Sequence, residues 1–241
     1  MFPIWIHTKE EVKRLLILGA GGFGHMIQET ARLLGYEEVV FLDDAVKGAD
    51  VIGKCCDYKA FLNEYDTAVA ALGDSGMRLY WTEQLMEAGY QVPAIIHPSA
   101  VVSPSAVIGN GSFIMQSAIV NTNTVVEHGV LVNSGAVVDH DSHVGCGAHI
   151  GLGSVVKANC VIPSRKKVEE GEVIFSTRRK IDGVTSRNLE DALYAFGFGL
   201  QCSYVKPFGE GHINETYAVY MPTEEEDEFA YILQRVNNNV F

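Results

Sequence analysis

The 241-residue sequence is poor in basic residues and has no long apolar segment. Eighteen Lys and Arg residues stand against 30 Asp and Glu residues, which gives a formal net charge of −12. Proteins that bind nucleic acid neutralise its phosphates with clustered Lys and Arg, so this balance argues against a nucleic-acid partner. No run approaches the roughly 18–20 apolar residues of a membrane-spanning helix, and no membrane association is predicted.

The first residues, MFPIWIHTKEEVKRL, lack the basic-then-apolar order of a signal peptide, so we expect a cytoplasmic protein. Cysteine is also scarce, and its spacing includes no C-x-x-C pair. The five cysteines are Cys55, Cys56, Cys146, Cys160 and Cys202. This pattern predicts neither a disulfide framework nor a thiolate zinc site, and we interpret these residues as reduced packing residues.

A period of six residues dominates the centre of the sequence. Residues 94–177 divide without insertion into fourteen hexads, and the third position of every hexad, from Ile96 to Ile174, is Ile or Val. A β-branched residue packs well on a strand, so each hexad predicts one short strand with its third residue pointing inward. The other positions favour Gly, Asn and Ser, which are typical of turns.

Three hexads make one triangular coil of eighteen residues, so the repeat predicts a parallel β-helix domain over residues 94–180 with between four and five coils. A strict period of six fits neither an amphipathic helix nor an antiparallel sandwich. Because the ends of a solenoid expose unpaired backbone, we expect the flanking segments to cover the two ends of the prism.

Residues 1–93 are predicted to form an α/β unit of half-Rossmann type. Strands are expected at 13–19, 38–44 and 66–74, with helices at 26–34 and 77–91. Between the first strand and the first helix, Gly19, Gly21 and Gly24 fit the G-x-G-x-x-G pattern, with Gly22 inside it, and the acidic pair Asp43 and Asp44 ends the next strand.

Glycines let a backbone approach a phosphate, and a helix N-terminus offers unpaired N–H groups to its charge. Asp43 and Asp44 then supply acceptors for a ribose or a base. The small size of the unit favours a mononucleotide or a nucleotide sugar. The pattern alone leaves NAD, or a purely structural turn, as alternatives.

The glycine-rich unit ending in FLDD, followed by IIHPSAVVSPSAVIG and the hexads, resembles bacterial sugar acetyltransferases over about residues 13–180. These are the relatives of sialic acid O-acetyltransferases and of N-acetyltransferases of UDP-4-amino sugars. The resemblance implies a left-handed β-helix, a homotrimer, a nucleotide sugar on the N-terminal unit, and acetyl-CoA between neighbouring subunits.

The family's catalytic histidine matches His140 of VVDHD, with Asp141 as the carboxylate beside it and Asp139 as the alternative. Two further positions match by resemblance, Asn133 of VLVNSG and His149 of AHIGLG. Two departures stand out. Phe23 replaces the histidine that many relatives have in the glycine loop, and the repeat ends without the usual G-V-P-A.

The resemblance therefore implies acetyl transfer from acetyl-CoA to a sugar, most simply a nucleotide-linked amino sugar or a hexosamine. An imidazole can take a proton at neutral pH, so we expect His140 to be the general base, and no metal is required. A backbone N–H near Gly147 or Gly151 is expected to bind the thioester oxygen, beside His149. Three alternatives remain open: a non-catalytic trimerising scaffold, a zinc enzyme of gamma carbonic anhydrase type with ligands among His128, His140, His143 and His149, and a dehydrogenase. The sugar, its nucleotide and the acceptor atom, nitrogen or oxygen, are not specified.

Residues 188–241 are expected to form a short β-rich segment. A helix is predicted at 188–199, two strands around a glycine-bearing turn at 203–221, and another strand at 229–241. VKPFGEGHINETYAV and YILQRVNNNVF resemble the first strands of N-acetylhexosamine kinases of the aminoglycoside phosphotransferase type. In those kinases the catalytic Asp and the magnesium ligands follow later, so the resemblance implies a truncated kinase segment that cannot phosphorylate a substrate.

Overall fold

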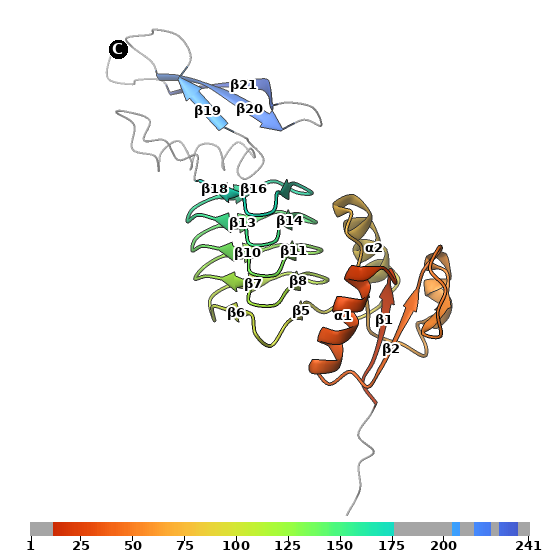
Figure 1. The fold of residues 1–241 in the computed structure, drawn as a ribbon. Helices are drawn as coiled ribbons and strands as arrows, with labels where there is room; N and C mark the ends of the chain where they lie inside the picture. Colours follow the sequence, from red (N-terminus) through yellow and green to blue (C-terminus); the bar gives the residue numbers. More distant parts are fainter. Residues whose placement is uncertain (1–11, 176–203, 208–214, 223–226, 236–241) are drawn as a thin grey trace, which may run out of the picture. The chain divides into compact units, whose positions relative to one another are not determined.

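The structure, a computed structural model, describes residues 12–175, 204–207, 215–222 and 227–235. The chain divides into two compact units at Phe175. The first unit contains an α/β part and a coiled part, and the second contains a small sheet (Figure 1). Among the described residues no helix is long and apolar enough to cross a membrane.

The α/β part has a four-stranded parallel sheet in the order β3-β2-β1-β4. Its central strand β1 buries four successive residues, Leu15 to Leu18, as expected for a parallel strand that is covered on both faces. The half-Rossmann prediction is therefore confirmed. The elements are β1 Arg14–Leu18, α1 Gly22–Leu33, β2 Glu38–Leu42, β3 Val51–Gly53, the 3-10 helix η1 Cys55–Phe61, β4 Ala68–Ala70 and α2 Ser75–Glu87.

Both helices begin earlier than the sequence predicts. Helix α1 begins at Gly22, inside the glycine-rich turn, and not at Met26. Helix α2 begins at Ser75, because the Asp74 carboxylate accepts a hydrogen bond from the Met77 N–H at 2.7 Å and caps its first turn.

The coiled part is a left-handed parallel β-helix, with one strand of two residues for each predicted hexad. Its strands form three parallel sheets in the orders β16-β13-β10-β7, β17-β14-β11-β8-β5 and β18-β15-β12-β9-β6. Partners are eighteen residues apart, as in Val125 and His143, so the three-hexad coil is confirmed. The strands are β5 Ile95–Ile96, β6 Val101–Val102, β7 Val107–Ile108, β8 Phe113–Ile114, β9 Ile119–Val120, β10 Val125–Val126, β11 Leu131–Val132, β12 Val137–Val138, β13 His143–Val144, β14 His149–Ile150, β15 Val155–Val156, β16 Val161–Ile162, β17 Lys167–Val168 and β18 Val173–Ile174.

The third-position residues fill the interior of the prism, as their periodicity predicts. In the inner coils they are almost fully buried, and they form one continuous apolar core with the small first-position residues Ala118, Ala136 and Ala148. Ile96 and Ile174, in the end coils, are partly buried against the same core.

The α/β part packs against one side of the prism, so the expectation that this flank covers an end is wrong (Figure 1). The outward residues on that side are Ile95, Phe113 and Leu131, and all three are buried in one apolar cluster with Ile27 of α1. Large apolar side chains at the second hexad position give this side an apolar surface for α1, and burial of that surface favours lateral packing.

Helix α2 lies along one corner of the prism, at the turns that lead into β8, β11 and β14. The corner residues Gly111, Gly129 and Gly147 are eighteen apart and all have positive φ. A Cβ atom on Gly147 would lie 2.9 Å from the Leu79 Cβ, so this corner accepts the helix only where it carries glycine. We refer to these three residues as the glycine corner.

The second unit contains a three-stranded antiparallel sheet in the order β19-β20-β21. Its strands are β19 Tyr204–Pro207, β20 Glu215–Pro222 and β21 Asp227–Arg235. This arrangement confirms the predicted strands of the C-terminal segment. The helix expected at 188–199 lies outside the described residues.

Replacing Gly147 with Ala tests the packing of α2 on the glycine corner. We expect the positive φ to cost about 1–2 kcal/mol of unfolding free energy and the collision with Leu79 to add about 1–3 kcal/mol. Gly153→Ala is the matched control, because Gly153 has φ +61° and its Cβ would meet nothing within 4 Å. Thermal unfolding followed by circular dichroism should show a clearly larger loss of Tm for Gly147→Ala, and equal losses would contradict the packing.

Candidate functional site

His140 lies in the exposed turn between β12 and β13, beside the carboxylate of Asp141. The Nδ1 atom of His140 is 2.7 Å from Oδ2 of Asp141, and the two side chains are 51% and 46% exposed. When Nδ1 carries its proton and donates to this carboxylate, the lone pair of the neutral ring is on Nε2. No group among the described residues forms a hydrogen bond with that Nε2 atom.

Two asparagines of the preceding coil hold this turn in place. The Asn123 amide donates to Oδ1 of Asp141 at 3.1 Å, and the Asn121 amide donates to Oδ1 of Asp139 at 3.0 Å. The same Asp139 oxygen accepts the backbone N–H of His140 at 2.8 Å. Of the two carboxylates predicted to support His140, Asp141 therefore contacts the ring and Asp139 holds the backbone.

The electrostatics of the turn favour the protonated imidazole. The hydrogen bond with Asp141 raises the pKa of His140 above its ordinary value, against a smaller opposing effect of desolvation, and the charges of Asp139 and Asp141 add to the rise. The hydrogen bonds from the His140 backbone and from Asn121 lower the pKa of Asp139. Both carboxylates next to His140 are thus arranged to stabilise a positive ring.

Asn133 and His149 lie together at a different corner of the prism. Asn133 is in the turn between β11 and β12, and its amide is 3.4 Å from Nε2 of His149 on β14. Within one chain the structure brings these two residues to each other and not to His140. Burial lowers the pKa of His149 to about 4, and the charges of Arg78 and Lys167 act in the same direction, so the ring is neutral at physiological pH.

The backbone N–H groups of Gly147 and Gly151 are both used inside the β-helix. They donate to the carbonyls of His128 and Val168, each at 3.0 Å. The ladder between successive coils uses both N–H groups, so neither is free within this chain to bind a thioester oxygen. Gly147 is also buried under α2.

The glycine-rich loop has the shape that a phosphate site needs. Gly19 has φ +102°, and a Cβ on Gly24 would collide with the Gly19 carbonyl, so only glycine fits this tight turn. Gly21 and Gly22 are exposed at the start of α1, whose N-terminus has no side-chain cap. The N–H groups of the first helical turn are thus available to an anion.

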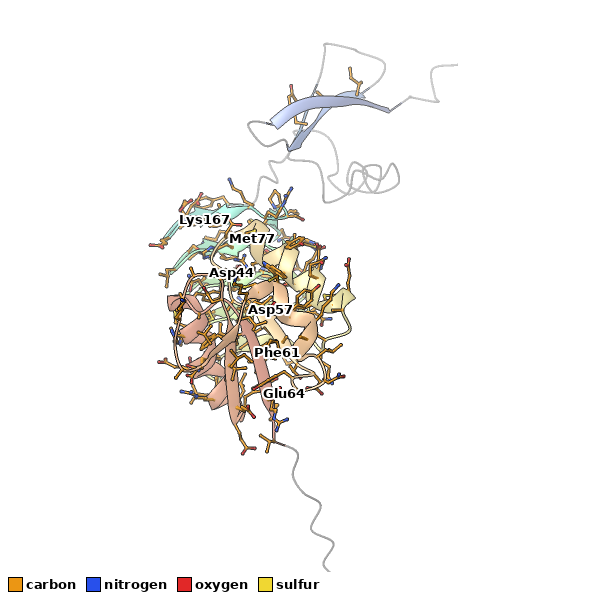
Figure 2. The ribbon with its side chains drawn as sticks, turned by 90° about the vertical axis from the view of Figure 1, so that its right-hand side faces the viewer. Asp44, Asp57, Phe61, Glu64, Met77 and Lys167 are labelled. Carbon is orange, nitrogen blue, oxygen red and sulfur yellow. The ribbon has the colours of Figure 1, made fainter. Side chains whose placement is uncertain are left out.

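The acidic pair at the end of β2 divides into a structural residue and a surface residue. The Asp43 carboxylate accepts hydrogen bonds from the backbone N–H groups of Ala20, Ala45 and Val46 at 2.7–2.8 Å. Desolvation raises the pKa of Asp43, but these bonds outweigh it and the net shift is downward. Asp44, labelled in Figure 2, accepts the Cys55 N–H at 3.1 Å. It is exposed, whereas Asp43 is half-buried, so Asp44 is the member of the pair that faces solvent.

Phe23, which replaces the expected loop histidine, packs against the β-helix. Its ring meets Phe113 of β8 edge-on, with centroids 5.2 Å apart. His25, two positions later on α1, is exposed and lies edge-on to Phe41, with centroids 5.1 Å apart. The side chain at position 23 therefore helps to dock the two parts and offers no polar contact to a ligand.

Histidines of the prism are dispersed over different sides. His143 is on β13 and pairs with Glu127 at 2.9 Å, whereas His149 is on β14 in another sheet. Among the described residues there is no group of three or more His, Cys, Asp or Glu side chains able to hold a metal ion.

Several residues that hold the site were not predicted. Asn121 and Asn123 stand eighteen positions before Asp139 and Asp141, so the coil period contains the signal for both contacts. Arg78, which contacts the loop of the α/β part and the β-helix, has no comparable signal, because in the sequence it is a single basic residue on a predicted helix.

A family model and several solved structures relate the chain to known proteins. The model of the PglD N-terminal domain matches residues 14–85. The acetyltransferase domain of PglB from Neisseria gonorrhoeae FA1090, solved in complex with acetyl coenzyme A, is 32% identical over 68% of this chain and 91% of that chain, with a TM-score of 0.56. PerB from Caulobacter crescentus, solved in complex with CoA and GDP-perosamine, is 27% identical over 68% of this chain and 90% of that chain, with a TM-score of 0.61.

A perosamine N-acetyltransferase from Caulobacter crescentus, solved as a mutant with asparagine in place of one histidine, is 26% identical and also has a TM-score of 0.61. The match covers 68% of this chain and 90% of that chain. The shared half-Rossmann unit, β-helix and level of identity show that this chain belongs to the bacterial sugar acetyltransferase family that includes the acetyltransferase domain of PglB, and that it is an acyltransferase.

Proposed function

We propose that the chain transfers the acetyl group of acetyl-CoA to an amino group on a nucleotide-linked sugar, with His140 as the general base. The observation that carries this proposal is the 2.7 Å contact between Nδ1 of His140 and the Asp141 carboxylate in an exposed turn. The similarity to PglB with acetyl coenzyme A and to PerB with GDP-perosamine supports the two substrates. An N-acetyltransferase among the similar structures favours nitrogen as the acceptor atom.

In this reaction the acceptor nitrogen attacks the thioester carbonyl carbon while Nε2 of His140 takes a proton from that nitrogen. The carbon–sulfur bond then breaks, and the imidazolium returns the proton to the departing thiolate of CoA. Asp141 keeps Nε2 as the accepting atom and stabilises the imidazolium, and Asn123 holds the carboxylate in position.

The exposed N-terminus of α1 is the proposed site for the phosphates of the nucleotide. Its N–H groups and the positive end of the helix dipole favour an anion there, and Asp44 provides a nearby acceptor for a ribose or a base. With phenylalanine at position 23, the phosphate would be held by backbone groups without a histidine.

We further propose a homotrimer in which the corner with Asn133 and His149 of one subunit faces the His140 corner of its neighbour. The separation of these residues within one chain supports the proposal, because neither corner alone contains the whole predicted site. The two sides that meet at His140 also carry exposed outward residues, Val101, Val107, Val161 and Val173. Exposed apolar residues on these two sides support a subunit interface there.

The C-terminal sheet is proposed to correspond to the first strands of a sugar kinase. Its three antiparallel strands and the glycine-bearing connection between β19 and β20 support this reading.

His140→Ala tests the proposed base. Release of CoA thiol, measured with a panel of nucleotide-linked amino sugars and free hexosamines, should fall by about a hundredfold or more, the usual scale for loss of a general base. His97→Ala is the control, since His97 is another turn histidine, bonded to Ser99. Equal turnover in His140→Ala and the unaltered chain would contradict the mechanism, and no turnover with any acceptor would favour a non-catalytic scaffold.

The pH dependence tests the role of Asp141. Because the carboxylate raises the pKa of His140, kcat/KM should rise with pH through a midpoint above the ordinary histidine value of about 6.5. Asp141→Asn removes the charge, so the midpoint should move to lower pH and the plateau should fall. Glu87→Gln, at the exposed end of α2, is the control and should leave the midpoint of the pH–rate profile unchanged. An unchanged midpoint in Asp141→Asn would show that the contact between His140 and Asp141 does not set it.

Mixed oligomers test the proposed trimer. His140→Ala and His149→Ala chains should each be inactive alone, but coexpressed chains should recover activity, since some interfaces then combine an intact His140 with an intact His149 from the neighbour. The activity should be measured as thiol release by purified mixed oligomers that carry two different tags. A mixture as inactive as its parents would show that each chain contains its own complete site.

A further inference from the structure

Arg78, on α2, is a fully buried charged side chain that interacts with backbone carbonyls instead of a carboxylate. The guanidinium donates to the carbonyls of Gly129 at 2.8 Å, Gly147 at 2.7 Å, Ala148 at 3.1 Å, Leu72 at 2.9 Å and Gly73 at 3.2 Å. Burial lowers the pKa of Arg78 to about 10, so the side chain is still charged at neutral pH. Among the described residues no carboxylate forms an ion pair with Arg78, although the charge of Asp74 favours its protonated form. Burying a charge in this way is unfavourable, and an apolar residue would suffice if α2 needed only packing.

One side of the guanidinium forms hydrogen bonds with the loop that follows β4. The bonded carbonyls of Leu72 and Gly73 lie at the carboxyl end of β4, next to the carboxyl end of β1. There the loop meets the glycine turn, since a Cβ on Gly19 would lie 2.8 Å from the Ala71 carbonyl oxygen. Ligands of open parallel sheets bind at this edge, so Arg78 holds a loop of the candidate nucleotide site.

The other side of the guanidinium forms hydrogen bonds with the β-helix immediately before His149. Gly147 and Ala148 precede that histidine directly, and Gly129 is the residue equivalent to Gly147 in the preceding coil. The charge of Arg78 is also one of the causes, after burial, that lower the pKa of His149. One side chain therefore contacts the loop beside the nucleotide site and the coil that carries a predicted acetyl-CoA residue.

We infer that Arg78 is a positioning residue that fixes the nucleotide-sugar loop to the acetyl-CoA side of the β-helix, which sets where the acceptor amine meets the thioester. The inference rests on the proposed function for its catalytic consequence. Only a planar fork of five N–H donors reaches both sides at once, and lysine, with one ammonium group, cannot.

Arg78→Lys and Arg78→Met test this role against Leu79→Ala, which shortens the neighbouring α2 side chain at Gly147 without touching the loop. Binding of UDP, GDP and CoA, measured by calorimetry, should stay within about twofold in Arg78→Lys. Its kcat for acetyl transfer should fall by about tenfold to a hundredfold, the effect of a misplaced reactant, while Leu79→Ala keeps most of its kcat. Arg78→Lys serves as the test if Arg78→Met fails to fold.

Two results would overturn the inference: equal kcat values in Arg78→Lys and Leu79→Ala, or loss of nucleotide and CoA binding together with kcat. If the unaltered chain acetylates no acceptor, the proposed function fails. The contact of Arg78 with the coil that carries His149 can then still be tested by an NMR titration of His149. Arg78→Met should then raise the His149 midpoint and Arg78→Lys should leave it low. No difference between the two variants would show that the charge does not act at His149.

Discussion

The structure depends on one β-branched residue in every six, which turns inward and fixes a coil of eighteen residues. This period places equivalent hexad positions of successive coils next to one another, as in Val125 and His143. The core, the glycine corner under α2 and the asparagine–aspartate contacts around His140 all follow from the same register. A shift of any coil by one residue would remove all three together, because inward and outward positions would exchange.

The three corners of the prism differ in their structural and proposed functional roles. The glycine corner is buried by α2 and gives its N–H groups to the coil ladder, so it is a docking surface. The His140 corner is exposed, and its carboxylates are held by the coil before it. The corner with Asn133 and His149 adjoins the α/β part and keeps its histidine neutral. The proposed reaction needs the second and third of these corners, which is why it is proposed for an assembly.

The β-helix and its register could be predicted from the sequence because a strict period leaves few alternatives for the chain. The lateral docking could not, since Phe113 and Leu131 look like ordinary strand residues until their common side is known. A sequence does not show which amides the ladder uses, so it cannot exclude the N–H groups of Gly147 and Gly151 as donors to a ligand. His140 and Asp141 were found by resemblance, and their contact depends on a turn in which Asp141 adopts φ +55°.

The central claim is that the His140–Asp141 pair acts as the base, and it is tested most directly by nitrogen NMR of the His140 ring over a pH titration. The account predicts a neutral ring with its proton on Nδ1, and a titration midpoint above about 6.5 that coincides with the midpoint of the pH–rate profile. A neutral ring protonated on Nε2, or a His140 midpoint that differs from that of the rate, would contradict it.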